Sequence, residues 1–386
     1  MEALELLELI QKGESSTVQF KERIEDTHKL SQELTAFSNT KGGIIIIGVN
    51  DKTGSINGLS FDEIRSLNEL IVNSTTNNVK PPIIITSETV LIDGQSLVVI
   101  YVEEGSSKPY KDKNGAIWVK NGSDKRKVVA NEEMARLLQS SKTMFADETL
   151  VGRSSISDID IDYYKKVYEK KFKISFDTSK VDLQTSLQNQ QLYRDGELTL
   201  AGVLLFCNNR QELRPLFSVQ CFSVNSTNLL GNSFDDNEPP FDGKLEDVYY
   251  QTMRFIERNI KKVPSGDSFN SELEWEIPKE IFEELIVNAL VHRDYFINST
   301  IKVFMFLDRI EIVSPGKLPN SQTEKTIQNG VSIPRNPVLQ SLAQYVLPYK
   351  GAGTGIMRAL SIYPNIVFRN KIENEQFISI IERKSE

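Results

Sequence analysis

The chain of 386 residues contains only two cysteines and two histidines. Two cysteines and two histidines are too few for a cysteine–histidine metal cluster. Cys207 and Cys221 could pair with each other, but we expect both to be buried free thiols in a reducing compartment. No apolar run approaches the roughly 18–20 residues that a membrane span needs, and no segment resembles a signal peptide. These absences predict a cytoplasmic protein that has no contact with a membrane.

Positive charge is also scarce, because the formal net charge is -8. An acidic surface does not attract polyanions as a whole, so any binding of nucleic acid would depend on a local basic patch. The phosphate-binding loop G-x-x-x-x-G-K-[ST] occurs nowhere in the chain. A helicase motor of that type is therefore excluded.

What the chain does contain is a succession of strand-like and helix-like segments that predicts an α/β (α+β) protein. Residues 1–139 alternate short β-rich runs with helical patterns, and Asp93-Gly94 joins two such runs in a hairpin. Residues 140–190 are polar and helical in patches, which is typical of a connector. Residues 191–386 return to the α/β pattern, so we expect two mixed domains joined by a helical segment.

One helix in the second domain has the pattern of a pocket wall. Pro278 suits its first turn, and Glu284, Asn288 and His292 follow at intervals of four residues, which places them on one face. The rest of the circumference is apolar, as in a buried helix. A buried carboxylate and amide need partners. They form either a polar network in the core or a site for a ligand that carries a metal ion.

The segment "EELIVNALVHRDY" around this helix resembles the N-box of the GHKL ATP-binding fold. More closely, it is similar to the ATPase-like module of bacterial RecG-related transcriptional regulators, as are "DRIEIVSPGKLP", "RNPVLQSLAQ" and "GAGTGIMRA". The resemblance implies a C-terminal GHKL-like α/β sandwich that binds ATP and Mg²⁺. Glu284 would polarise the attacking water and Asn288 would hold the Mg²⁺. The implied nucleotide-binding residues are Asn288, His292, Ser314, Gly316, Gly351, Gly353 and Gly355.

The chain departs from the GHKL pattern at the position whose side chain hydrogen-bonds to adenine. Those enzymes use an Asp in a D-x-G-x-G turn, whereas this chain has "SPGKL", with Ser314 at the Asp position and Leu318 at the second Gly. A hydroxyl can bond to a base, but the charge-assisted contact is lost. Nucleotide binding and hydrolysis therefore remain separate hypotheses.

The first domain resembles the AlbA_2 domain of Schlafen proteins, also called divergent AAA-4, through "ESSTVQFK", "LTAFSNTKGGIIIIGVND" and "WVKNGSDKRK". In the Schlafen nucleases three acids form a metal-dependent RNA-cleaving cluster, and the matching positions here are Glu14, Gln19 and Asp51. Gln19 keeps an oxygen donor but removes a negative charge, which weakens a site for a hard cation. Surface acids in turns are the alternative reading of Glu14 and Asp51.

A basic patch with one aromatic residue favours binding of DNA or RNA without cleavage, because phosphates attract such clusters through counterion release. A solvated basic turn is the alternative. The predicted nucleic-acid-binding residues are Lys21, Trp118, Lys120, Lys125, Arg126 and Lys127.

Together these patterns predict a nucleic-acid-binding regulator with a divergent GHKL-type module. The nucleotide would bias an orientation or the state of a homo-oligomer, and so change nucleic-acid affinity. The alternatives are a Schlafen-like endoribonuclease, an active ATPase in a defence system, and a scaffold whose two domains bind no ligand.

Overall fold

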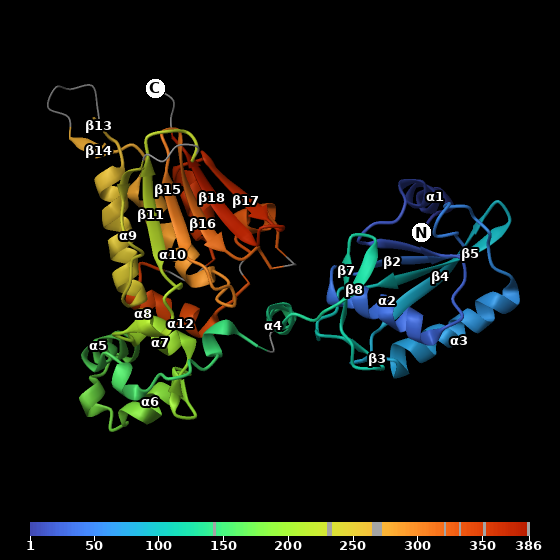
Figure 1. Cartoon of the computed structure of the whole chain (residues 1–386), viewed down its shortest axis with the longest axis horizontal. Coiled ribbons are helices and arrows are strands. Elements are labelled where there is room, and N and C mark those ends of the chain that lie inside the picture. Colours follow the sequence, from blue (N-terminus) through green and yellow to red (C-terminus); the bar gives the residue numbers. More distant parts are fainter. Residues whose placement is uncertain are drawn as a thin grey trace. The chain divides into compact units, whose positions relative to one another are not determined.

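The computed structural model describes residues 1–141, 144–229, 234–264, 272–319, 322–331, 333–349 and 353–383. The chain forms two compact units, Met1–Met144 (unit 1) and Phe145–Glu386 (unit 2). Both units mix helices and strands, which confirms the α/β class that the sequence predicted (Figure 1). Of the helices in the described ranges, none has the length and the hydropathy that crossing a membrane requires.

Unit 1 is built on a four-stranded sheet of order β1-β2-β5-β4. β1 and β2 are parallel, and the other neighbours are antiparallel. β4 and β5 form the predicted hairpin, with Asp93 and Gly94 both at positive φ in the turn. The strands are β1 (Val18–Lys21), β2 (Gly43–Ile47), β4 (Ile85–Ile92) and β5 (Gln95–Val102).

Helices cover both faces of this sheet, α1 on one face and α2 with α3 on the other (Figure 1). Ile45 and Ile47 pack beneath α2 and α3, while Ile46 packs against the side chains of α1. Successive side chains of a strand point to opposite faces, which explains why this central strand is apolar at every position. The helices are α1 (Ala3–Lys12), α2 (Thr27–Asn39) and α3 (Phe61–Asn77).

The remaining elements of unit 1 pack beside α2 or close the unit. The hairpin β7–β8 contacts α2, and Leu137 of α4 shares a small core with Ile117 and Val119. The elements are β3 (Val79–Lys80), β6 (Lys111–Asp112), β7 (Trp118–Asn121), β8 (Asp124–Lys127) and α4 (Asn131–Ser140).

Unit 2 begins with a group of short helices beside its main sheet (Figure 1). Within residues 145–190, Tyr164, Val167 and Leu187 belong to the same hydrophobic core as the sheet. Both cysteines are buried in this core and unpaired. The elements are η1 (Ala146–Glu148), η2 (Ile156–Asp158), α5 (Ile161–Phe172), η3 (Phe176–Thr178), α6 (Leu183–Asn189), β9 (Tyr193–Arg194), β10 (Glu197–Leu198), α7 (Leu200–Phe206) and α8 (Arg210–Leu213).

The main sheet of unit 2 has six strands in the order β12-β11-β15-β16-β18-β17. Only the pair β11–β15 is parallel among these neighbours. The long connection between these two strands supplies α9 and α10. The strands are β11 (Val219–Val224), β12 (Phe234–Asn237), β15 (Ile301–Met305), β16 (Arg309–Pro315), β17 (Ile366–Lys371) and β18 (Gln376–Glu382).

α10 lies in the middle of the helical layer, where it contacts α9, α12, α13 and β16. Its side chains are buried around most of the circumference, including Ile281, Phe282 and Leu290, as expected from its composition. The other elements of unit 2 are α9 (Leu245–Asn259), β13 (Lys262–Pro264), β14 (Leu273–Trp275), α10 (Lys279–His292), α11 (Glu324–Gln328), α12 (Pro337–Val346) and α13 (Gly355–Ile362).

Candidate functional site

A cavity of about 130 Å³ in unit 2 is lined by the polar side of α10, by strands of the main sheet and by the start of α13. The structure brings together on its wall every described residue of the set that sequence reasoning assigned to a nucleotide. Gly351 lies outside the described residues. The lining members of the set are Glu284, Asn288, His292, Ser314, Gly316, Gly353 and Gly355.

One part of the cavity wall is apolar and partly aromatic. Phe368 and Phe377 lie on neighbouring strands with their rings stacked 5.8 Å apart, and Ile312 and Leu318 line the same cavity. Ser314, which is 7% exposed, contributes a buried hydroxyl from β16. Such a wall suits a flat, weakly polar group that makes a small number of directed hydrogen bonds.

The polar part of the wall centres on Glu284. Its Oε1 accepts a hydrogen bond of 2.8 Å from Nδ2 of Asn288, one helical turn later on α10. Its Oε2 lies 2.9 Å from Nη2 of Arg358 on α13. A Cβ atom added at Gly355 would overlap this carboxylate, so the Glu284 side chain packs directly against the backbone at the start of α13.

His292 is half-buried at the end of the same polar stripe. Burial lowers the pKa of His292 to about 4, and the nearby charge of Arg335 acts in the same direction. Its Nε2 lies 3.4 Å from the hydroxyl of Tyr349. The ring is therefore neutral near pH 7, and it can act as a hydrogen-bonding group but not as a counterion for a phosphate.

Gly316 has a structural role in addition to its place on the wall. Its φ is 101°, and a Cβ there would collide with the Cβ of Asp294. The turn after β16 is held in place because the backbone N–H of Asp294 donates to the carbonyl of Pro315 at 2.9 Å.

Sequence reasoning missed three cations that line the cavity: Lys317, Arg335 and Arg358. Arg358 could have been found from its spacing, because it follows Gly355 by three residues and so lies in the first turn of a helix that opens at a glycine. Arg335 opens the segment "RNPVLQSLAQ" but was given no role there, and its Nη2 donates to the carbonyl of Lys317 at 2.7 Å.

In unit 1 the structure joins Glu14 to Gln19 and places Asp51 beside Lys21. Gln19, on β1, donates from its amide to Glu14, and the backbone N–H of Phe20 donates to the same carboxylate oxygen at 2.7 Å. Asp51 lies 3.7 Å from the ammonium of Lys21. Among the residues that the structure describes, no three His, Cys, Asp or Glu side chains gather to hold a metal ion.

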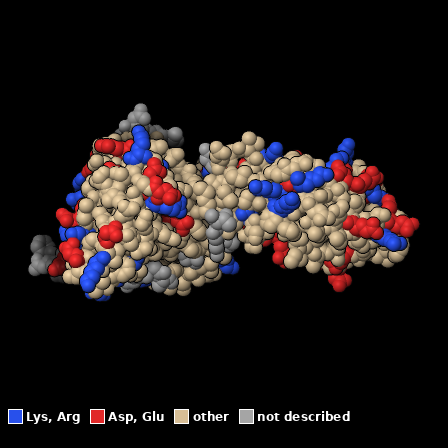
Figure 2. Space-filling model, turned by 90° about the horizontal axis from the view of Figure 1, so that it is seen from below, with Lys and Arg blue, Asp and Glu red and all other residues tan. Residues whose placement is uncertain are grey.

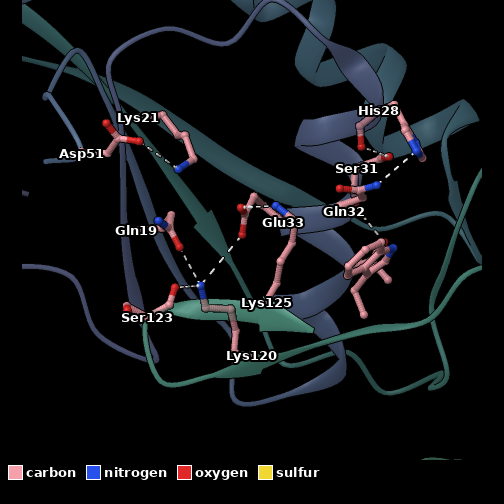
Figure 3. Close-up of polar contacts among 12 residues, drawn as sticks. Gln19, Lys21, His28, Ser31, Gln32, Glu33, Asp51, Lys120, Ser123 and Lys125 are labelled. Atoms are coloured by element: carbon pink, nitrogen blue, oxygen red, sulfur yellow. Dashed lines mark hydrogen bonds and ion pairs between the residues drawn. The ribbon is translucent and has the colours of Figure 1, made fainter. Parts of the chain in front are cut away.

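Lys120 lies inside this cluster rather than on the surface (Figure 3). Its side chain is 1% exposed, and its ammonium lies 2.6 Å from Oε1 of Gln19 and 2.6 Å from the carbonyl of Ser123. Glu33 Oε2 lies 3.9 Å away, and the ring of Phe37 packs against the ammonium. Burial lowers the pKa of Lys120, and the charge of Glu33 opposes this shift.

Three other members of the predicted basic patch also have partners within unit 1, and Lys127 is exposed on β8. Lys125 pairs with Glu33 at 2.6 Å, and Arg126 pairs with Glu133 through two nitrogens. Trp118 donates from its indole to Asp112 at 2.9 Å. Figure 2 shows Lys and Arg in scattered groups, several of them beside Asp and Glu, on a face that is mostly uncharged.

Comparison with known families gives one match within each unit. Residues 14–129 match the family described as "Schlafen, AlbA_2", and residues 298–376 match the family described as "Putative ATP-dependent DNA helicase recG C-terminal". The chain is therefore a two-module protein of the α/β class. It carries a Schlafen AlbA_2 domain in unit 1 and a RecG-related ATPase-like module in unit 2, as its motifs predicted. The second match begins after α10, so Glu284, Asn288 and His292 lie outside it.

Two solved structures show more distant likeness, and a search of the curated proteins found no match. The DIP2311 protein from Corynebacterium diphtheriae is 20% identical with a TM-score of 0.48, over 95% of this chain and 75% of that chain. The N-terminal domain of a RecG-related protein from Nitrosomonas europaea is 23% identical with a TM-score of 0.25, over 34% of this chain and 96% of that chain. Neither likeness is close enough to assign a function.

Proposed function

We propose that the cavity of unit 2 binds a nucleotide, ATP with Mg²⁺, and that the protein is a nucleic-acid-binding regulator. The observation that carries this proposal is the convergence of α10, β16 and the start of α13 on one cavity whose wall contains both aromatic and cationic side chains. A nucleotide likewise combines a flat base with charged phosphates. This match supports a nucleotide over a wholly apolar or a wholly ionic ligand.

The residues at the polar part fit Mg²⁺ and phosphate. Asn288 would hold the Mg²⁺ through its neutral carboxamide oxygen, which is a ligand type that hard cations prefer. Bound Mg²⁺ would offset the charge of the phosphates. Gly353 and Gly355 allow a close approach of backbone to the phosphates, and the N-terminus of α13 favours an anion there.

Binding is better supported than hydrolysis. Glu284 would be the general base of an ATPase, but Arg358 and Asn288 both engage its carboxylate. Both oxygens of this carboxylate therefore already have partners in the structure. We therefore assign the nucleotide a regulatory role in this proposal.

For unit 1 we propose binding of DNA or RNA through the outer surface of β8 and the start of α4. Lys127 is exposed, and Arg126 is paired only at the surface, with about half of its side chain exposed. Surface ion pairs contribute about 0–1 kcal/mol, so exchanging Glu133 for a phosphate costs little. Glu14, Gln19 and Asp51 provide one carboxylate fewer than a three-acid nuclease site needs, and Lys120 already supplies a cation beside Gln19.

The test of the nucleotide site is a thermal melting experiment on the full chain with ATP, ADP or GTP, each with and without MgCl₂. A ligand at 100 times its dissociation constant stabilises the folded state by about 2.7 kcal/mol, so a clear rise in melting temperature is expected with ATP and Mg²⁺. Asn288→Ala should lose the Mg²⁺-dependent part of the rise. Gln344→Ala, an exposed change on α12, is the matched control. A chain that responds to none of these nucleotides does not have the proposed function.

A further inference from the structure

The carboxylate of Glu284 occupies a place that has the features of an anion-binding site. Three groups surround it: the guanidinium of Arg358, the amide of Asn288 and the backbone at Gly355, the first residue of α13. The Glu284 side chain is 12% exposed, whereas that of Arg358 is 44% exposed. The anion in this place is therefore a side chain of the protein itself, held between two walls of the cavity.

The same three groups would suit a phosphate. Guanidinium groups and amide donors make charge-assisted hydrogen bonds to phosphate oxygens, and the first turn of a helix adds unpaired N–H groups and a favourable dipole. Arg358 is well placed to change partners. It reaches the cavity from α13, it is nearly half exposed, and its contact with Glu284 uses one of several N–H donors.

We infer that Glu284 is an internal competitor for the phosphate-binding position, and that Arg358 transfers from Glu284 to the terminal phosphate of the ligand. The inference rests on the proposed nucleotide function and adds two features to it. Arg358 becomes the residue that distinguishes ligands by their phosphate charge, and Glu284 weakens the binding of every phosphate ligand that must displace it.

Neutralising Glu284 and neutralising Arg358 should change the affinity for phosphate ligands in opposite directions, so the two roles can be tested separately. Removing the charge of Glu284 leaves Arg358 without its internal anion, so a phosphate no longer has to compete for the guanidinium. Removing the charge of Arg358 takes away the cation that the phosphate would gain. If Glu284 only helped to hold the nucleotide, its neutralisation would weaken binding instead.

The experiment is calorimetric titration of ATP, ADP, AMP and adenosine, in MgCl₂, into the full chain and into its Glu284→Gln and Arg358→Gln variants. We expect Glu284→Gln to bind ATP several-fold more tightly than the unchanged protein and to bind adenosine equally well. We expect Arg358→Gln to bind ATP roughly tenfold more weakly, as for a lost charge-assisted hydrogen bond, while its affinity for adenosine is unchanged. Arg358→Lys should restore part of the preference for ATP, and Gln344→Ala should alter nothing.

The outcomes separate the inference from the proposed function. If the unchanged chain binds none of the four compounds, the nucleotide function itself fails and the inference fails with it. If ATP binds but Glu284→Gln binds it equally or more weakly, the competition is overturned. If Arg358→Gln keeps the full preference for ATP over adenosine, Arg358 does not bind the phosphates. Should Arg358→Gln fail to fold, judged by circular dichroism, the Glu284→Gln titration decides.

Discussion

The ammonium of Lys120 lies 2.6 Å from Oε1 of Gln19, a residue 101 positions earlier in the chain. This contact pairs the amide of Gln19 with a buried cation, at the position where the Schlafen nuclease pattern has an acid. Gln19 bridges two charges, since its N–H donates to Glu14 while its carbonyl accepts from Lys120. The negative charge of Glu14 and the positive charge of Lys120 are therefore linked through the amide of Gln19.

The first prediction concerns the missing acid. Gln19→Glu places a second carboxylate beside Glu14, and Lys120 can neutralise only one of the two. The variant should gain affinity for a divalent cation, so that MnCl₂ raises the melting temperature of the variant more than that of the unchanged protein. Gln11→Glu, an exposed change on α1, is the control. Equal responses of all three proteins to MnCl₂ would contradict the prediction.

The second prediction separates two lysines of the basic patch. Lys120→Met removes the partner of Gln19 and Glu33 in the interior, which should lower the free energy of unfolding of unit 1 by about 2–4 kcal/mol. Lys127→Met changes an exposed side chain and should shift it by less than about 0.5 kcal/mol. Urea unfolding followed by the fluorescence of Trp118, in a Trp275→Phe background, measures both. Similar losses in the two variants would mean that Lys120 is not a buried structural residue.

The third prediction concerns nucleic acid. The double variant Arg126→Gln, Lys127→Gln should bind DNA or RNA more weakly, and the slope of log affinity against log salt should fall by about 2, one for each lost phosphate contact. Filter retention at several salt concentrations measures the slope. Lys12→Gln on α1 is the control, because it removes an exposed charge from another element of unit 1. An unchanged slope in the double variant would exclude this surface as the binding site.

The fourth prediction uses the close approach of α13 to α10. Gly355→Ala introduces a Cβ where the carboxylate of Glu284 now lies, so the Glu284 side chain must move and its contacts with Asn288 and Arg358 are disturbed. Overpacking of this kind costs about 1–3 kcal/mol. Gly152→Ala is the matched control, because the nearest atom to its added Cβ is Glu197 Oε1 at 3.8 Å. The prediction fails if the two alanine variants melt at the same temperature.

The fifth prediction concerns a buried acid near the start of unit 2. Burial raises the pKa of Asp147 to about 7, although the N–H of Leu339 donates to its Oδ2 at 2.8 Å. The folded state therefore holds the proton more tightly than the unfolded chain does. The contribution of protonated Asp147 to the free energy of unfolding is complete below the unfolded pKa of 3.8, and this contribution is lost as the pH rises through about 7.

Asp147→Asn replaces the titratable carboxyl group with an amide, whose oxygen can still accept the hydrogen bond from the N–H of Leu339. Relative to the variant, the unchanged protein should lose stability between about pH 4 and pH 7, by about 1.4 kcal/mol for each unit of pKa difference. Trp275 reports on unit 2 in a Trp118→Phe background. Asp235→Asn, at an exposed position, is the control. Parallel pH profiles of the unchanged protein and Asp147→Asn would contradict the raised pKa.

The local patterns of the sequence were sufficient for the fold class, for both families and for part of the cavity wall. The hairpin at Asp93-Gly94 follows from the backbone preferences of two adjacent residues. The polar stripe of Glu284, Asn288 and His292 follows from the helical repeat, because residues four apart share a face whatever the helix packs against.

Only the tertiary structure decided which charges are available and which are already paired. Lys120 reads as a surface cation in the sequence, yet the packing of β7 against α2 buries it between Gln19 and Glu33. Arg358 and Glu284 are 74 residues apart, and they meet because α13 packs against α10. A side chain's partner depends on which elements pack together, and no spacing along the chain contains that information. The sequence therefore determined the kinds of chemical groups at each site, and the packing determined their charge balance.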